Sequence, residues 1–176
     1  MTNGLAVVQE SKREGLQKKK TTSLAILAGK RALENAGVTA EEIEVIIVAT
    51  CTPDYFFPNT ACQVQEAIGA KHAVAFDLSA ACSGFLFALS TAQAYIKGGI
   101  YQKALIVGAE TMSKMIDWSD RSTCVLFGDG AGAVVLKAEE SGRYAQVTQS
   151  IGKKGGALTL RSRNQIQYET DPKAKE

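Results

Sequence analysis

The chain has little net charge: 20 lysine and arginine residues against 18 aspartate and glutamate residues give a formal charge of +2 over 176 residues. So small a charge does not favour nucleic acid, whose phosphates select strongly basic surfaces. No stretch approaches the roughly 18 apolar residues of a membrane span. The N-terminus lacks the charged-then-apolar pattern of a secretion signal. We therefore expect a cytoplasmic protein with neither a nucleic-acid nor a membrane partner.

The sequence is also poor in metal-ligand and disulfide patterns. It has one histidine, His72, and four cysteines, Cys51, Cys62, Cys82 and Cys124, with no CxxC pair and no regular spacing. We expect no metal, no disulfide framework and no cofactor. Each cysteine is therefore considered singly, and the simplest role of a buried one is that of a small hydrophobic residue.

Apolar runs rich in β-branched residues alternate with stretches of helical character. The expected strands are Val45–Ala49, Ala73–Asp77 and Ala104–Gly108, and the expected helices begin near Thr21, Thr60 and Cys82 and end near Gly37, Gly69 and Gly98. The first two strands are expected to be buried, as is the third helix, which is apolar on every side. Strands and helices in alternation predict right-handed crossovers and a mainly parallel sheet in an α/β fold.

Two further apolar runs, Cys124–Phe127 and Ala133–Leu136, are joined by GDGAG and are expected to add antiparallel pairing. The glycines suggest a phosphate loop. However, the Walker lysine and the GxGxxG spacing are missing, and a strand-like run follows instead of a helix. Tight backbone packing is the better interpretation of these glycines.

The ends of the chain differ in composition from its middle. Residues 1–20 are polar and basic and are expected to be poorly ordered. Residues 21–140 are expected to form the folded domain. Residues 141–176 are expected to hold a glycine-rich loop and a polar tail.

Cys82 stands between an expected strand and an expected helix, in the stretch DLSAACSGFLFAL. Unpaired N–H groups and the dipole at a helix N-terminus favour a thiolate. Small neighbours on both sides leave room for a substrate carbonyl, and ligands of open α/β sheets bind at the carboxyl ends of strands. On spacing alone, a nucleophilic role and a packing role for Cys82 are equally consistent with the sequence.

Several segments together resemble a known family. FDLSAACSGFLFALSTA is similar to the nucleophile segment of beta-ketoacyl-acyl carrier protein synthase III, which initiates bacterial fatty acid synthesis. EVIIVATCTPDYFFPNTACQVQEAIGAK, KALIVGAETMS and DWSDRSTCVLFGDGAGAVVLKA follow in the family's order and at similar spacings. The resemblance covers about residues 21–140 and implies one half of a thiolase-like fold, with a buried helix starting at Cys82.

The resemblance implies a two-step reaction. Cys82 would accept an acyl group from acetyl-CoA or another short acyl-CoA, and malonyl-acyl carrier protein would then condense with it to a 3-ketoacyl product. The Cys82 backbone N–H would form part of an oxyanion hole. The acyl-CoA is a substrate here, so no cofactor is implied.

Other positions are implied by the resemblance one at a time. Met112, Phe127 and Cys51 would line the acyl pocket, although core packing explains them equally well. Arg121 would lie against the coenzyme's adenine, a role that suits a guanidinium plane; a surface pairing with Asp120 is its alternative.

Phe57 matches a phenylalanine that reaches from one subunit toward the active site of its partner, so the resemblance implies a homodimer. The surrounding loop TPDYFFPN has two prolines and three aromatic residues, which suit a rigid projection. A self-contained surface turn is the alternative interpretation of this loop.

The sequence also departs from the family. The family's histidine and asparagine, which stabilise decarboxylation, belong to a second half that this chain lacks. His72 does not substitute, because five strand residues put about 15–20 Å between it and Cys82. The family's opening strand and adenine-binding tryptophan are not recognised either. We therefore expect a fragment, a split-gene product or a truncated copy.

Three functions stay open. The chain is either a condensing-enzyme half that works with a separate second half, or a non-catalytic remnant or interaction module. The third is a related thioester-using synthase of secondary metabolism.

Overall fold

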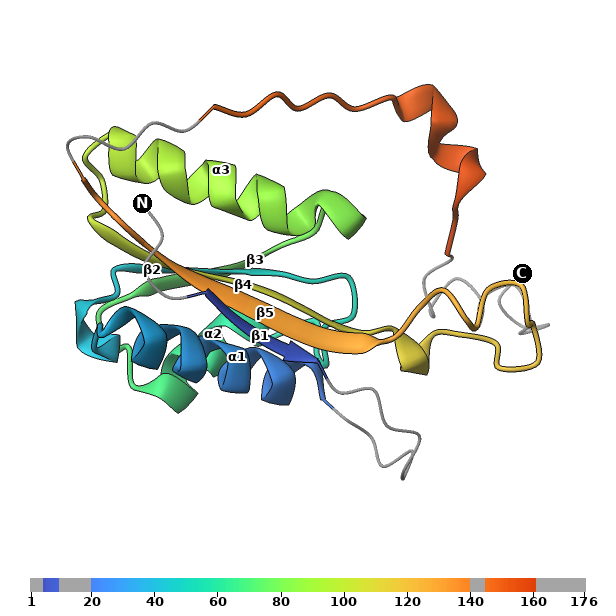
Figure 1. The fold of residues 1–176 in the computed structure, drawn as a ribbon, viewed down its shortest axis with the longest axis horizontal. Helices are drawn as coiled ribbons and strands as arrows, with labels where there is room; N and C mark the ends of the chain where they lie inside the picture. Colours follow the sequence, from blue (N-terminus) through green and yellow to red (C-terminus); the bar gives the residue numbers. More distant parts are fainter. Residues whose placement is uncertain (1–4, 10–19, 140–144, 161–176) are drawn as a thin grey trace, which may run out of the picture. The chain divides into compact units, whose positions relative to one another are not determined.

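The computed structural model describes residues 5–9, 20–139 and 145–160 (Figure 1). The chain divides into two compact units, Met1–Arg143 and Tyr144–Glu176, which are described separately. In the second unit, the described residues 145–160 contain one short 3-10 helix, η4 (Gly152–Ala157). The expected glycine-rich loop extends past them, and the expected polar tail lies outside the described residues.

The first unit is built on a five-stranded mixed sheet with the order β1-β5-β4-β2-β3. The strands are β1 (Leu5–Gln9), β2 (Val45–Ala49), β3 (Val74–Leu78), β4 (Lys103–Thr111) and β5 (Asp129–Lys137). β2 pairs in parallel with both β3 and β4, whereas β5 runs antiparallel to β4 and to β1. The predicted parallel pairing is confirmed for β2, β3 and β4, whereas the antiparallel pairing expected between residues 124–127 and 133–136 is replaced by pairing of β5 with β4 and β1.

Three helices cover the two faces of the sheet. α1 (Thr21–Ala36) and α2 (Thr60–Ile68) lie on one face, and α3 (Gly84–Lys97) lies on the other (Figure 1). α1 ends at Gly37, whose φ of 62° is the left-handed conformation that glycine adopts readily. Among the described residues, no helix combines the length and the apolar character that crossing a membrane requires.

Alternation along the central strands divides the core into two clusters. Ile46 and Val48 pack with α1 and α2, whereas Val45 and Ile47 pack with Ala88 and Ala92 of α3. All five residues of β2 are buried, as expected for a strand covered on both faces.

The structure corrects the expectation that the opening strand is missing. Leu5–Gln9 forms β1, an edge strand that pairs with β5 from Leu5↔Val134 to Gln9↔Gly130. The short apolar stretch LAVV is enough for one strand, because pairing with an existing sheet supplies its partners. The rest of the expected N-terminal segment lies outside the described residues, apart from Lys20.

The two elements on either side of Cys82 are less buried than expected. β3 is an edge strand with no fully buried residue, and Val74 on it is 49% exposed. α3 begins at Gly84, two residues after Cys82, and only Gly84, Ala88 and Ala92 on it are buried. The buried face of α3 is the one toward the sheet, whereas other apolar residues of the helix are partly or largely exposed, with Leu86 at 52%.

The last apolar runs also differ from expectation. Residues 121–126 form turns, so Cys124 does not start a strand. β5 instead begins at Asp129 and includes Gly130 and Gly132 of GDGAG, with Gly132 opposite Gly108 of β4, while Gly128 precedes the strand. This placement in a strand agrees with backbone packing rather than with a phosphate loop.

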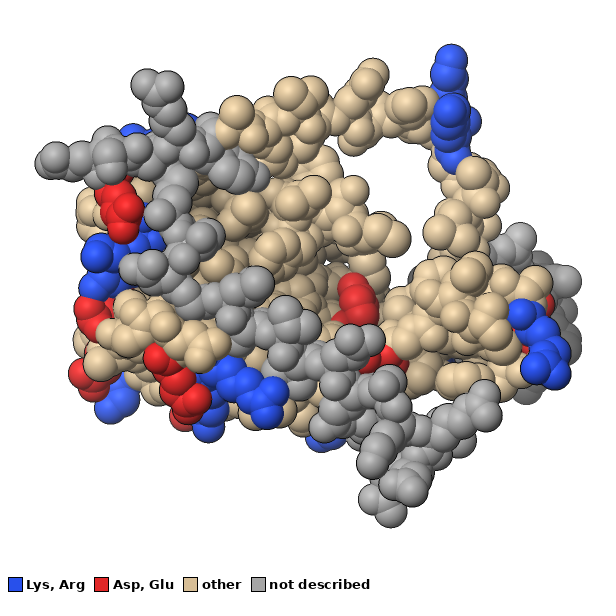
Figure 2. All heavy atoms as spheres, viewed as in Figure 1, with Lys and Arg blue, Asp and Glu red and all other residues tan. Residues whose placement is uncertain are grey.

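In Figure 2, Lys and Arg side chains (blue) lie interspersed with Asp and Glu side chains (red) at the left and lower left of the face drawn. This distribution fits the small net charge of +2.

Candidate active site

The carboxyl ends of three parallel strands meet at one edge of the sheet. Ala49 lies opposite both Leu78 of β3 and Gly108 of β4, so the segments that follow these strands start side by side. The segment after β3 carries Cys82, and the segment after β2 carries Cys51 and Phe57. Met112 and Arg121 follow β4, and Phe127 precedes β5, which starts beside the end of β4. The topology therefore places the segments that carry the predicted site residues at the same end of these strands.

Cys82 is exposed and lies in a 3-10 turn, η2 (Ala81–Ser83), that leads from β3 into α3. Ala81 has φ 47°, which makes it the one non-glycine residue with positive φ in the described part of the chain. Such a conformation costs about 1–3 kcal/mol and is concentrated at functional sites. The thiol therefore stands on a strained turn just before a helix whose first N–H groups have no intrahelical partner.

The contacts around position 84 explain why a glycine stands there, which the sequence alone does not show. A Cβ at Gly84 would stand 3.2 Å from the Cβ of Ala49, at the end of β2. Likewise, a Cβ at Gly108 would stand 3.2 Å from Phe85. Gly84 thus brings the start of α3 close to the sheet, whereas the room around the thiol comes from the exposed Ala81 and Ser83.

Cys51 lies next to the cysteine turn. Its Sγ is 3.8 Å from Oγ of Ser79, three residues before Cys82, and its side chain is exposed. Cys62 lies in α2, as predicted, with its thiol 3.7 Å from the carbonyl oxygen of Ala75. This contact places Cys51 beside Ser79, in the segment that leads from β3 to Cys82.

The remaining predicted positions differ in exposure. Met112 starts the short helix η3 (Met112–Lys114) and is half-buried, as is Phe127. Arg121 is exposed. The carboxylate of Asp120 accepts hydrogen bonds from Ser122 and Thr123, which argues against its serving mainly as the partner of Arg121.

The aromatic loop between β2 and α2 presents its side chains to solvent. Tyr55, Phe56 and Phe57 are 50%, 84% and 86% exposed. The loop's end is held by Asp77 of β3, whose carboxylate accepts from the N–H groups of Thr60 and Ala61 at 2.8 and 2.7 Å. A loop that is fixed at its base while its aromatic tip is exposed fits the predicted projection toward a partner.

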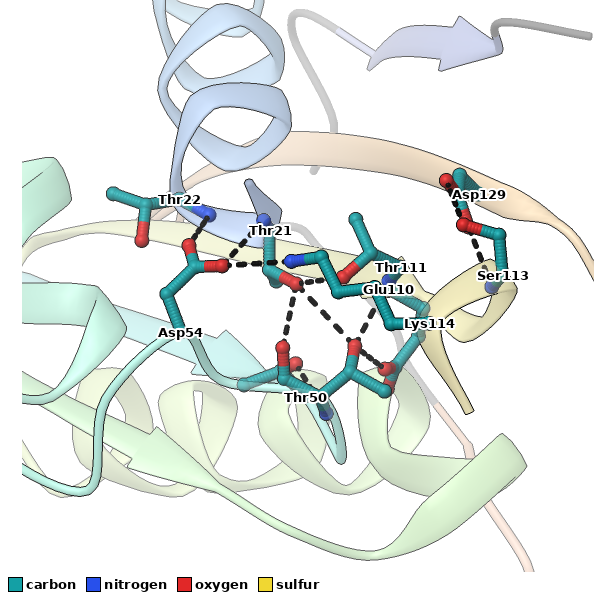
Figure 3. A network of polar contacts seen from close by, with 10 residues as sticks. Thr21, Thr22, Thr50, Asp54, Glu110, Thr111, Ser113, Lys114 and Asp129 are labelled. Carbon is teal, nitrogen blue, oxygen red and sulfur yellow. Dashed lines mark hydrogen bonds and ion pairs between the residues drawn. The ribbon is translucent and has the colours of Figure 1, made fainter. Parts of the chain in front are cut away.

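Asp54 holds the start of that loop and was not expected from the sequence (Figure 3). Its carboxylate accepts from the N–H groups of Thr21 and Thr22 at 3.2 and 2.9 Å and from the Lys114 ammonium at 2.9 Å. Burial raises the pKa of Asp54, but the hydrogen bonds from Thr22 and Lys114 outweigh it and bring the pKa below its usual value. Asp54 therefore caps α1, whose N-cap residue Lys20 makes no side-chain cap bond.

Beneath the loop lies a network of buried threonines from three elements (Figure 3). Thr21 Oγ1 donates to the Thr52 carbonyl oxygen at 2.5 Å and lies 2.7 Å from Thr111 Oγ1. Glu110 accepts from the Cys51 N–H and from the Thr52 hydroxyl. Polar residues directly after buried strands are the sequence signal that could have pointed to this network.

His72 is exposed in the turn before β3. Because β3 then runs from Val74 to Leu78, this histidine is at the opposite end of the strand from the cysteine turn. The prediction that His72 does not serve the site is consistent with this placement.

The fold and the cysteine turn define a class of protein, and comparison with known proteins identifies the family within that class. The structure is similar to solved structures of thiolase-like condensing enzymes. These include 3-oxoacyl-[acyl-carrier-protein] synthase III of Aquifex aeolicus (TM-score 0.79, 35% identity, 96% of this chain and 66% of that one). The priming beta-ketosynthase of the R1128 polyketide pathway is similar as well (TM-score 0.87, 30% identity, 98% of this chain and 60% of that one). The chain thus has a partial thiolase-like fold.

Sequence comparison names the family. Residues 76–155 match the family model for 3-oxoacyl-[acyl-carrier-protein (ACP)] synthase III. A beta-ketoacyl-[acyl-carrier-protein] synthase III of Bordetella petrii is 62% identical over 118 residues, which are 67% of this chain and 36% of that protein. One of Clostridium perfringens is 53% identical over 142 residues, or 80% of this chain and 44% of that protein. The chain belongs to the beta-ketoacyl-acyl carrier protein synthase III family and spans well under half the length of these curated relatives.

Proposed function

We propose that this chain carries the acyl-accepting site of a condensing enzyme of fatty acid synthesis, with Cys82 as the nucleophile. The observation that carries the proposal is the exposed Cys82 on a strained turn, at the edge where three parallel strands end. Membership of the synthase III family supports the same reaction.

In the first step, the Cys82 sulfur attacks the thioester carbonyl of acetyl-CoA or another short acyl-CoA. A bond forms between Sγ and the acyl carbon, the bond to the coenzyme sulfur breaks, and the thiol proton leaves with coenzyme A. The Cys82 N–H serves as one donor to the oxyanion that develops, a contact whose loss typically costs about 3 kcal/mol. Arg121, on the exposed loop after β4, holds the coenzyme's adenine, and Met112, Phe127 and Cys51 border the acyl chain.

In the second step, malonyl-acyl carrier protein loses carbon dioxide, and the resulting carbanion attacks the acyl group on Cys82. The 3-ketoacyl product stays on the carrier protein, and the cysteine thiolate is released. This step requires the family's histidine and asparagine, which belong to the part of the relatives that this chain does not span. In our proposal, Phe57 contacts the neighbouring site in a homodimer.

Two alternatives have observations of their own. The open apolar face of α3, on which Leu86 is 52% exposed, and the edge strand β3 suit a non-catalytic interaction module. The similarity to a polyketide priming ketosynthase keeps a thioester-using synthase of secondary metabolism in view.

The test is intact-mass spectrometry of the purified chain after incubation with acetyl-CoA. We expect the mass of one added acetyl group on the wild type and on Cys62→Ala, a matched control in α2, and none on Cys82→Ala. Circular dichroism checks that each variant is folded. A folded wild type that gains no acetyl group contradicts the proposal and favours the interaction module.

The choice of acyl donor and the second step of the reaction distinguish fatty acid synthesis from secondary metabolism. Fatty acid synthesis is supported by two results together. Acetyl-CoA labels the chain, and malonyl-acyl carrier protein then yields a 3-ketoacyl product once a polypeptide carrying the histidine and asparagine is added. Labelling by other acyl thioesters in preference to short acyl-CoA would favour secondary metabolism.

A further inference from the structure

Glu110 lies on the part of β4 that extends beyond its partner β2. The β2–β4 pairing ends at Ala49↔Gly108, whereas β4 continues to Thr111 along β5. The Glu110 carboxylate therefore stands beside the backbone that follows β2, among the buried threonines of Figure 3.

Both carboxylate oxygens of Glu110 hold that backbone. Oε1 accepts from the Cys51 N–H at 2.7 Å, and Oε2 accepts from the Thr52 hydroxyl at 2.5 Å. The same Thr52 hydroxyl accepts from the Thr111 N–H at 2.8 Å. Hydrogen bonds to a charged acceptor are about twice as strong as neutral ones, so Glu110 fixes two consecutive residues to β4.

The fixed residues face the cysteine turn. Cys51 Sγ is 3.8 Å from Ser79 Oγ, and Ser79 starts the segment that ends at Cys82. Glu110 thus sets the position of the side chain against which this segment rests. Each oxygen of the carboxylate accepts a hydrogen bond from the segment that it holds.

We propose that Glu110 is a positioning residue for acyl transfer: it holds Cys51–Thr52 so that Cys51 and the Ser79–Cys82 segment form one rigid wall for the incoming acyl group. This proposal rests on the proposed function of Cys82. Glu110 itself does not touch the substrate in this proposal. It acts only through the residues that it holds, one of which, Cys51, borders the acyl chain as proposed above.

The test compares two reactions of the same thiol by mass spectrometry. Acetylation by acetyl-CoA requires the wall, whereas alkylation by iodoacetamide requires only an accessible and deprotonated thiol. In Glu110→Ala we expect acetylation of Cys82 to slow about tenfold or more, because small misplacements are costly in oriented reactions, while alkylation stays within about twofold of wild type. Glu110→Gln retains an acceptor for the Cys51 N–H and is expected to recover part of the acetylation rate.

Glu44 provides a matched control at the other end of the same strands. Its carboxylate accepts from the N–H groups of Gln102 and Lys103, where β4 begins. Glu44→Ala therefore also loses two contacts to a carboxylate, and we expect it to leave the ratio of acetylation to alkylation at the wild-type value.

An unchanged ratio in Glu110→Ala, or an equal fall in Glu44→Ala, would overturn the proposal and reduce Glu110 to a purely structural residue. A wild-type chain that gains no acetyl group would instead refute the proposed function itself, and this proposal with it. The two failures are distinguished because the second is seen before any variant is compared.

Discussion

Replacing Asp54 by alanine tests how the aromatic loop is fixed to the rest of the domain. The Asp54 side chain is only 6% exposed and accepts from two N–H groups of α1 and from Lys114. A lost helix cap costs about 0.5–2 kcal/mol. A lost, partly exposed ion pair adds up to about 1 kcal/mol. We therefore expect Asp54→Ala to lower the free energy of unfolding by about 0.5–3 kcal/mol at neutral pH.

The loss should depend on pH with a definite sign. The folded-state pKa of Asp54 is lowered, so its contribution is present above the ordinary carboxyl value of about 3.9 and disappears as the pH falls through the folded-state pKa. The difference between wild type and Asp54→Ala should therefore shrink in acid. Asp54→Asn keeps one acceptor oxygen without the charge. Its free energy of unfolding should lie between those of wild type and Asp54→Ala at neutral pH, and its difference from Asp54→Ala should be nearly independent of pH.

Urea unfolding followed by circular dichroism measures these differences. Glu66→Ala is the control, since Glu66 is an exposed carboxylate on α2; it should change stability by no more than about 0.5 kcal/mol. Equal losses in Asp54→Ala and Glu66→Ala, or a loss in Asp54→Ala that persists unchanged in acid, would refute the reasoning.

Two further predictions concern the packing of α3 and an exposed carboxylate. Gly84→Val should cost about 1–3 kcal/mol in urea unfolding, because a Cβ there meets Ala49 at 3.2 Å, whereas Gly128→Ala, with no atom within 4 Å, should have little effect. Glu42 has its pKa lowered to about 2, chiefly by the hydrogen bond from Lys103. In Lys103→Met an NMR titration should show the Glu42 pKa rising toward its usual value, and an unmoved titration would exclude this cause.

Sequence patterns predicted the elements whose signals are local. The β-branched run of Val45–Ala49 identified β2, and the spacing Thr39-x-x-Glu42 is the pattern of the capping box that the structure has at the 3-10 helix η1 (Ala40–Glu42). The junction before α3 identified Cys82 because strand, small residues and helix follow one another directly. Such features depend on neighbours within a few residues.

Other features could not be predicted because they depend on contacts between distant residues. Glu110 and Cys51 are 59 residues apart, and Asp54 caps a helix that starts 33 residues earlier. The exposure of α3 depends on what covers its outer face, and β1 became recognisable only through its pairing with β5. A periodic pattern of apolar residues indicates which face of an element can be buried, but it does not show which other residues cover that face.

The most direct test of the central claim is to locate the acetyl group after incubation with acetyl-CoA. Cys51 and Cys82 are both exposed and belong to neighbouring segments, so their thiols compete on equal terms of access. Peptide mapping by tandem mass spectrometry distinguishes them. The account predicts acetylation at Cys82, with Cys51, Cys62 and Cys124 unmodified. Acetyl groups on Cys51, or spread evenly over the exposed thiols, would contradict it.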